Sequence, residues 1–343
     1  MRPRIMLLCA LASVVGAVLI AGHAGSRATA APSPYAMSSS ALGTIDAAAA
    51  EAAFPDPGSV EAAGIFPPDD RTLVGDTKAW PYRTIAQLIG FDSHNVPTHT
   101  CTGTFVSPNV VLTAAHCLYH SGAFAGAILA APGITPFSRP YGYQIATVAS
   151  VPQGWKDGDG RNGFDAPVRS PQFDYGIVVF DGDPFAGMLA PYPELAHITP
   201  DYVTQQNPML MTAGFPGDKQ PLSMWTTKSS EFEMDDAFLY YKLDIYAGQS
   251  GSPIFAVTDR RTYAVSVLAY SGPATNFSAR LLPTVLKYLN DECAKLHCTL
   301  VTHELSGSGE DLSTPTPIPS PTPTPLPAAV HKYHVAAPLL SRD

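Results

Sequence analysis

The stretch that decides the fold runs from position 101 to position 117 and reads CTGTFVSPNVVLTAAHC. Two apolar β segments, Thr104–Val106 and Val110–Thr113, flank a Ser-Pro-Asn turn, and this pattern predicts a buried hairpin. A disulfide between Cys101 and Cys117 would join the ends of the hairpin and fix His116 beside it. A general base needs such fixed placement, because it must take a proton from a nucleophile within hydrogen-bond reach.

Two further motifs lie downstream of this histidine. Residues 248 to 253 read GQSGSP, which puts Ser250 in a tight glycine turn. In such a turn the backbone N–H groups of Gly248 and Ser250 can converge on a developing oxyanion. Between the two motifs, Asp174 precedes the apolar strand Gly176–Phe180. A buried carboxylate there can hold one tautomer of an imidazole and stabilise its charged form.

Each motif alone is weak. A histidine beside a cysteine and a G-x-S-G turn are more often structural than catalytic, and Asp181 and Asp183 are rival carboxylates. The combination is far more specific, because chymotrypsin-type enzymes carry their triad in the order His, Asp, Ser, whereas subtilisin and the α/β-hydrolases do not. The sequence therefore predicts a catalytic triad of His116, Asp174 and Ser250, with an oxyanion hole and no need for a cofactor.

Composition narrows the classes of partner. The chain has 343 residues, of which 45% are hydrophobic, so it can form a substantial core. Only 14% are charged and 34 are proline, a mixture that favours loops and strands over long surface helices. The net charge of −9 includes no basic block, so nucleic acid is not expected as a partner.

The first thirty residues, 1–30, are expected to be a signal peptide. Arg2 and Arg4 precede an uncharged apolar run that is followed by small residues and an A-x-A site ending at Ala30. Cleavage after Ala24 and an uncleaved membrane anchor are the alternatives. Because the run is shorter than the ~20 residues that a bilayer needs, we expect a secreted protein without a membrane span in its mature form.

Cysteine usage fits export. Cys9 would leave with the signal peptide, and the four remaining cysteines would meet an oxidising compartment. Four cysteines allow three pairings, and the spacing favours two local loops. The expected disulfides are Cys101 with Cys117 and Cys293 with Cys298.

The flanks of the chain differ from its centre. Residues 31–64 are rich in Ala, Ser, Pro and Gly with almost no patterned apolar face, and are expected to be a propeptide. Residues 304–343 carry Thr-Pro and Ser-Pro repeats, which favour an extended spacer, and then a short tail that is either an attachment tag to a surface or a disordered end. Residues 65–303 are expected to form the folded domain, as a monomer.

Short β segments separated by turn residues fill this domain, without the helix and strand alternation of a parallel sheet. The predicted strands are Thr84–Ile89, Thr104–Val106, Val110–Thr113, Gln144–Ala149, Gly176–Phe180, Leu210–Ala213, Tyr240–Ile245, Ile254–Val257 and Tyr263–Ala269. One helix is predicted near the end, because Leu282, Val285, Leu286 and Leu289 recur at helical spacing and Pro283 suits a first turn. The expected fold is all-β with a C-terminal helix.

On these motifs the sequence resembles the glutamyl endopeptidase, or V8-like, family of trypsin-like serine proteases. The resemblance spans Ile65 to Asn290 and includes Asp69-Asp70-Arg71-Thr72, Asp174-Tyr175-Gly176, Gly214-Phe215-Pro216, Asp218-Lys219 and the GQSGSP turn. It implies two antiparallel six-stranded β-barrels with the active site between them, a zymogen cut near Gly64 or Ile65, and protein or peptide substrates cleaved through an acyl-enzyme.

The sequence departs from the family at the specificity pocket S1. Glutamate-specific members carry a histidine on the strand after the serine and a hydroxyl residue five positions before it, where this chain has Leu268 and Ile245. A glutamate side chain buried there would lose its water without gaining a donor, at a cost of several kcal/mol. We expect Ile245, Leu268 and Tyr270 to line an apolar S1 pocket that prefers a hydrophobic side chain.

Three alternatives accompany these predictions. Residues 155–163 offer oxygen ligands that suggest calcium, but Arg161 breaks the ligand spacing, so a surface turn is favoured and no metal is predicted. A catalytically silent secreted binding or adhesion module would keep the same fold. A serine esterase would use the same catalytic groups.

Overall fold

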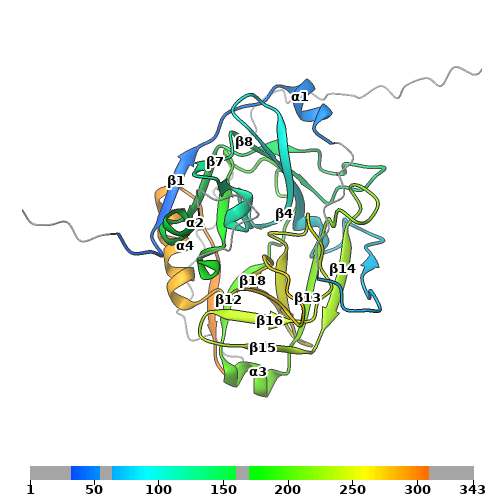
Figure 1. The fold of residues 1–343 in the computed structure, drawn as a ribbon, viewed down its shortest axis with the longest axis vertical. Helices are drawn as coiled ribbons and strands as arrows, with labels where there is room; N and C mark the ends of the chain where they lie inside the picture. Colours follow the sequence, from blue (N-terminus) through cyan, green and yellow to red (C-terminus); the bar gives the residue numbers. More distant parts are fainter. Residues whose placement is uncertain (1–31, 55–63, 160–169, 309–343) are drawn as a thin grey trace, which may run out of the picture. The chain divides into compact units, whose positions relative to one another are not determined.

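The computed structural model describes residues 32–54, 64–159 and 170–308 (Figure 1). The expected signal peptide with Cys9, most of the Thr/Pro-rich tail and Arg161 of the calcium alternative lie outside these residues. Among the described residues, no helix has the length and apolar character needed to cross a membrane.

Two large sheets make up the described domain. In spatial order, sheet A contains β1 (Met37–Ala41), β10 (Val148–Pro152), β11 (Gly176–Val179), β5 (Val110–Thr113), β4 (Pro97–Ser107), β3 (Ile85–Phe91), β8 (Ala127–Pro132) and β9 (Gln144–Ile145). Sheet B contains β2 (Thr72–Leu73), β14 (Trp225–Ser229), β13 (Met209–Gly214), β17 (Pro253–Val257), β18 (Thr262–Val267), β12 (Glu194–Ile198) and β20 (Thr302–Leu305).

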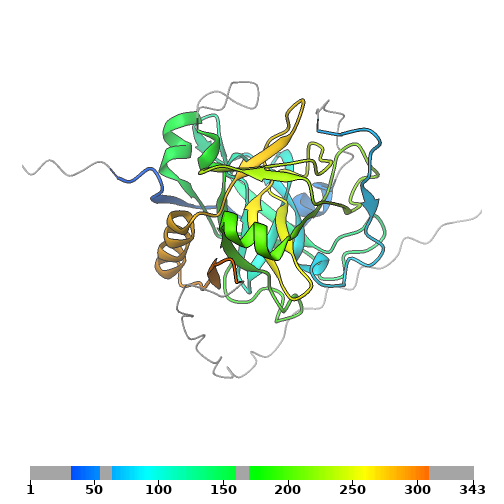
Figure 2. The same cartoon turned by 90° about the horizontal axis from the view of Figure 1, so that it is seen from below.

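Smaller elements complete the fold (Figures 1 and 2). A three-stranded sheet contains β15 (Phe232–Met234), β16 (Phe238–Tyr241) and β19 (Asn276–Ala279), and β6 (Tyr119–His120) pairs with β7 (Ala123–Phe124). The helices are α1 (Ala47–Ala52), α2 (Gln153–Asp159), α3 (Pro200–Gln206) and α4 (Pro283–Lys295), with 3-10 turns η1 (Tyr82–Thr84), η2 (Ala115–Cys117) and η3 (Pro171–Phe173).

The predicted fold class is confirmed. Each of the nine predicted strands overlaps an observed strand, and the arrangement is consistent with a two-barrel plan whose barrels do not close. The sheets contain eight and seven strands instead of six each. Among the strands of the described residues, the expected antiparallel pairing has one exception, β12, which runs parallel to both β18 and β20. β20 follows α4, so a helical connection precedes this parallel edge strand.

The predicted helix and both disulfides are also confirmed. Proline occupies the first turn of α4, and the apolar stripe of this helix is buried against the core. Glu292 on α4 accepts a hydrogen bond from Ser150 on β10 at 2.9 Å, which fixes the helix to sheet A. Cys101–Cys117 and Cys293–Cys298 are bonded, with Cα atoms 6.2 and 4.7 Å apart.

Folded structure extends into both flanks of the expected domain. β1 and α1 lie within residues 31–64, and β20 crosses the expected boundary after residue 303, with Leu305 buried. Backbone pairing holds β1 and β20, and such pairing leaves little apolar pattern in the sequence. The proposed propeptide therefore contains a strand and a helix that belong to the same compact unit as residues 65–308.

Candidate active site

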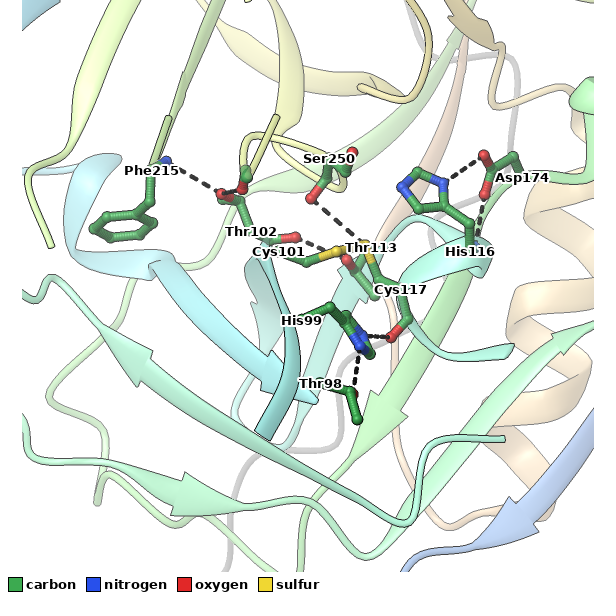
Figure 3. Close-up of a disulfide and its surroundings, with 11 residues drawn as sticks. Thr98, His99, Cys101, Thr102, Thr113, His116, Cys117, Asp174, Phe215 and Ser250 are labelled. Carbon is green, nitrogen blue, oxygen red and sulfur yellow. Dashed lines mark hydrogen bonds and ion pairs between the residues drawn. A yellow bond between two sulfur atoms is a disulfide. The ribbon is translucent and has the colours of Figure 1, made fainter. Parts of the chain in front are cut away.

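The hairpin of β4 and β5 carries the candidate base. The two strands pair at Thr104↔Leu112 and Phe105↔Val111, and η2 follows directly. The disulfide between Cys101 and Cys117 joins the middle of β4 to the end of η2. As predicted, the histidine at position 116 therefore sits on a stapled hairpin (Figure 3).

His116 and Asp174 form a bidentate pair. The ring Nδ1 lies 2.7 Å from one carboxylate oxygen of Asp174, and the backbone N–H of His116 donates to the other at 2.9 Å. The Asp174 side chain is fully buried, whereas the imidazole is 14% exposed. Burial by itself raises the pKa of Asp174, but the charge and hydrogen bonds of His116, together with the nearby hydroxyl of Tyr270, lower the pKa below its usual value. The carboxylate is therefore held ionised against the imidazole.

Ser250 lies on a turn whose shape depends on glycine. Gly248 and Gly251 have φ angles of +94° and +86°, a region that favours glycine. A Cβ on Gly251 would come within 2.1 Å of the carbonyl oxygen of Thr102, so any side chain there would displace the turn. Among the described residues, the amides of Gly248 and Ser250 donate to no backbone carbonyl, whereas that of Gly251 donates to Leu268. Two amides of the turn are thus available for an incoming oxygen.

Thr102 connects the hairpin of the base to the turn of the serine. Its backbone N–H donates to the carbonyl of Ser250 at 2.8 Å, and its hydroxyl donates to the carbonyl of Gly248 at 2.9 Å. The same hydroxyl accepts from the backbone N–H of Phe215 at 3.2 Å. Figure 3 shows the ring of His116 between Asp174 and Ser250, with its second nitrogen on the side of Ser250.

The predicted S1 residues occupy different environments. Ile245 and Leu268 are 3% and 2% exposed and belong to one apolar cluster with Leu243 and Ile254. Tyr270 instead stacks on Phe277, with ring centroids 4.9 Å apart, and its hydroxyl lies close enough to Asp174 to lower the pKa of that carboxyl. The structure thus brings Tyr270 to the carboxylate of the candidate triad.

Asp244 is a buried acid that no sequence motif singled out. It precedes Ile245, is 1% exposed, and accepts the backbone N–H groups of Phe66 and Asp70 at 2.6 and 2.8 Å. Burial raises the pKa of Asp244. Both of its oxygens are directed to the segment that begins at Gly64, whose carbonyl accepts the N–H of Ile245.

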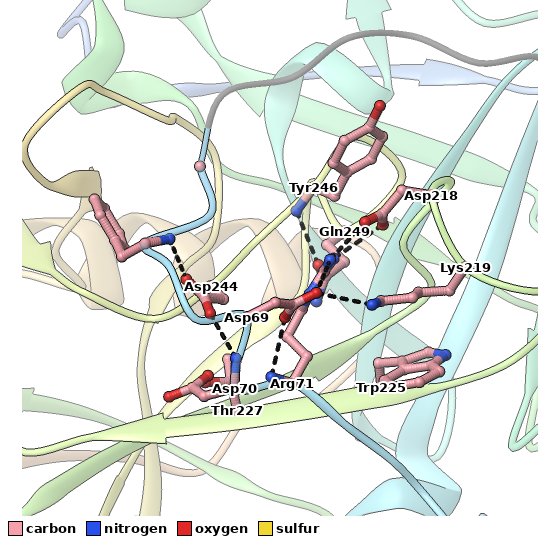
Figure 4. Close-up of polar contacts among 12 residues, drawn as sticks. Asp69, Asp70, Arg71, Asp218, Lys219, Trp225, Thr227, Asp244, Tyr246 and Gln249 are labelled. Atoms are coloured by element: carbon pink, nitrogen blue, oxygen red, sulfur yellow. Dashed lines mark hydrogen bonds and ion pairs between the residues drawn. The ribbon is translucent and has the colours of Figure 1, made fainter.

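A second polar network, centred on Arg71, lies near Gln249 of the Ser250 turn (Figure 4). The side chain of Arg71 has no exposed surface and bonds both Asp69 and Asp218, at 2.8 and 2.5 Å. Lys219 bonds Asp69 at 2.8 Å and lies over the ring of Trp225. The hydrogen bond of Arg71 is the main reason that the pKa of Asp69 lies well below its usual range. The family resemblance rested partly on these residues, but their pairing could not be read from the sequence.

A cavity is distinct from the candidate catalytic site, and a potential metal-ligand group is not a usable metal site. A cavity of about 380 Å³ is lined by Trp80, Tyr192, Glu194, Arg260 and neighbouring residues, and none of His116, Asp174 and Ser250 lines it. Among the described residues, one group has metal-ligand geometry, Cys101, His116 and Cys117. Its two sulfurs are bonded to each other, so they are not thiolates and cannot ligate a metal in the usual way.

The chain is similar to known proteases in sequence and in fold. A family model described as trypsin matches residues 75–154. The glutamyl endopeptidase of Bacillus licheniformis is 32% identical over 196 residues, 57% of this chain and 55% of that protein. A protein of Bacillus subtilis named extracellular metalloprotease is 29% identical over 225 residues, 65% of this chain and 67% of that one. The chain spans between about half and two thirds of the length of these curated relatives.

Two solved structures share the fold. A Glu endopeptidase in complex with MPD has a TM-score of 0.53 and 23% identity, covering 68% of this chain and 99% of that one. The protease Anisep from Arthrobacter nicotinovorans has a TM-score of 0.51 and 18% identity, covering 65% and 99%. The chain is therefore similar to trypsin-like serine proteases over residues 75–154 and to glutamyl endopeptidase over 57% of its length, and it shares their fold.

Proposed function

We propose that this protein is a secreted serine endopeptidase that hydrolyses peptide bonds through an acyl-enzyme. His116 accepts the proton of Ser250, and the serine oxygen attacks the peptide carbonyl. Asp174 holds the imidazole in the required tautomer, and the amides of Gly248 and Ser250 hold the oxyanion. The observation that carries the proposal is the bidentate contact between buried Asp174 and His116, next to the turn of Ser250.

The proposed mechanism follows from the direction of each hydrogen bond. An ionised carboxylate only accepts, so Nδ1 of His116 carries the hydrogen and Nε2 keeps its lone pair. That lone pair lies on the side of Ser250, where a base is needed. When the leaving amine departs, the same nitrogen returns the proton to it, and water then repeats the cycle on the acyl-enzyme.

We further propose that the S1 pocket is apolar. Ile245 and Leu268 present aliphatic side chains where glutamate-specific relatives are expected to carry polar groups, and both belong to one apolar cluster. The neighbouring carboxylate of Asp244 already accepts two backbone amides, so it is not oriented toward a basic substrate side chain. A glutamate in this pocket would lose hydration without a partner.

The activity is tested by labelling the protein with a fluorophosphonate probe and mapping the modified residue by mass spectrometry. Labelling at Ser250 is expected, together with its loss in the Ser250→Ala variant. Ser252→Ala, changed two positions along the same motif, is the matched control and should still react. A processed and folded protein that never reacts would favour a silent binding or adhesion module instead.

Substrate preference needs a separate experiment. Digestion of a defined peptide mixture should give cuts after hydrophobic residues, and a majority of cuts after Glu would rule out the apolar pocket. Matched ester and peptide substrates decide between an esterase and a peptidase. N-terminal sequencing and intact mass of the exported form test the proposed signal peptide and the cut near Gly64 or Ile65.

A further inference from the structure

We propose that residues 33–54 are a permanent arm of the folded domain, and that they stay bound after the chain is cut between residues 54 and 65. The proposal rests on the processing proposed above, because only a processed chain can keep or lose this arm. It predicts a mature protein of two noncovalently associated pieces. Its test measures association, so it does not depend on whether the protein is an active enzyme.

Backbone pairing holds the centre of the arm. β1 runs antiparallel to β10 over five residue pairs, from Met37↔Pro152 to Ala41↔Val148, and is the outer strand of sheet A. The hydrogen bonds continue beyond the strand, since Gly43 donates to the carbonyl of Gly126 at 2.7 Å. Without the arm, β10 would present an edge of unpaired backbone groups. The strand therefore completes the sheet.

Aromatic side chains hold the beginning of the arm. The ring of Tyr35 meets Phe173 edge to face at 5.0 Å and stacks on Tyr288 of α4 at 6.4 Å. The carbonyl of Ala36 accepts the N–H of Gln153 at 2.7 Å, at the start of α2. Phe173 directly precedes Asp174 in the chain. This end of the arm thus supports the turn that presents the candidate catalytic carboxylate.

The end of the arm is a short helix with one buried face. Ala50 and Ala53 are 1% and 0% exposed, so one face of α1 packs against the core. Glu51 pairs with Arg139 at 2.6 Å, and the guanidinium lies 4.0 Å from the centre of the Phe54 ring. The arm is therefore anchored at both ends as well as along its strand, as expected for a constitutive part of the domain.

An inhibitory arm would instead have to leave before substrate could bind. Figures 1 and 2 both show β1 beside α4, on the outer edge of sheet A. Within the described ranges, the hydrogen bonds, ion pairs and ring contacts of residues 33–54 join none of them to His116 or Ser250. Substrate access thus gives no reason for the arm to dissociate.

The experiment uses the full chain with Ser250→Ala, so that it cannot cut itself. A recognition sequence for a site-specific endoprotease is placed between residues 55 and 63, and the protein is cut to completion. On size exclusion at micromolar concentration the two fragments are expected to elute together. The midpoint of thermal unfolding should shift by less than about 2 °C from the uncut protein.

A pair of substitutions on one helix gives the control. Ala50→Asp buries an unpaired carboxylate and should increase the fraction of free fragment after cutting by at least ~10-fold. Ala48→Asp, at an exposed position of the same helix, should behave like the parent. Tyr35→Ala provides a milder variant if Ala50→Asp fails to fold before cutting. Separate elution of the fragments in the parent would overturn the proposal, whatever the activity of the enzyme.

Discussion

The replacement Asp174→Asn tests the proposed mechanism most directly. The carboxylate of Asp174 accepts two hydrogen bonds from His116, one from its backbone N–H and one from its ring. Asparagine has a single acceptor oxygen. The backbone N–H cannot reverse its role, so the oxygen should stay with it and the amide N–H₂ should face the ring. The imidazole must then accept at Nδ1 and carry its hydrogen at Nε2, where it can no longer take the proton of Ser250.

The size of the effect follows from this tautomer. A triad whose imidazole is held in the wrong tautomer loses about 10⁴ in kcat, or roughly 5 kcal/mol of transition-state stabilisation. KM should change little, because the substrate contacts are untouched. The rate of hydrolysis of a peptide with a hydrophobic residue before the cut bond is measured beside the labelling rate of Ser250, and both should fall together.

Asp181→Asn is the matched control, since Asp181 is an exposed acid a few residues further along the chain. This variant is expected to keep the parent rate, and circular dichroism should show that both proteins are folded. A folded Asp174→Asn variant with kcat within tenfold of the parent would refute the assigned role of the carboxylate.

Three further predictions concern stability. Burial lowers the pKa of His99 to about 4, so as the pH falls the unfolded chain takes up a proton before the folded chain does. The free energy of unfolding of the parent should therefore fall by on the order of 2 kcal/mol between pH 6.5 and 4, whereas that of His99→Gln should not. Urea unfolding at each pH measures this difference. Replacing Cys101 and Cys117 together by Ala opens a loop of 16 residues and should lower the free energy of unfolding by about 3 kcal/mol in the same assay. An unchanged free energy of unfolding would show that this disulfide does not stabilise the fold. Arg71→Met leaves two carboxylates without their buried partner and should cost about 3 kcal/mol, whereas Lys242→Met, which breaks an exposed pair with Glu231, should cost less than about 1 kcal/mol by thermal unfolding.

Sequence reasoning worked best where local pattern and chemistry coincide. The hairpin ending at His116, the glycine turn around Ser250 and the helix from Pro283 each carry their signal within a few residues. Both disulfides followed from spacing alone. These features fix the fold class and indicate the candidate site.

Other features depend on partners that are distant in the chain. Arg71 meets Asp218 across 147 positions, and Asp244 accepts amides from a segment more than 170 positions away, so no window of sequence contains either interaction. Strand β8, which reads AILAAP, lacks the alternation that marks a strand and has a single β-branched residue, Ile128.

The arm around β1 could not be predicted from the sequence for a different reason. Its sequence, MSSSA, has almost no apolar face beyond Met37, because backbone pairing with β10 and contacts outside the strand do most to hold it in place. Tyr270 was expected to line the S1 pocket, and its effect on the pKa of Asp174 depends on a loop geometry that spacing does not reveal.

The three hydrogen bonds of Thr102 have a consequence for how the two halves of the molecule can move. This residue belongs to the strand that leads toward the base, yet it bonds the carbonyls on either side of Gln249 and the amide of Phe215. A rigid-body rotation of one sheet against the other would have to break all three bonds at once. We therefore do not expect hinge bending between the two sheets to regulate the protein. Loss of catalytic activity on heating should coincide with global unfolding.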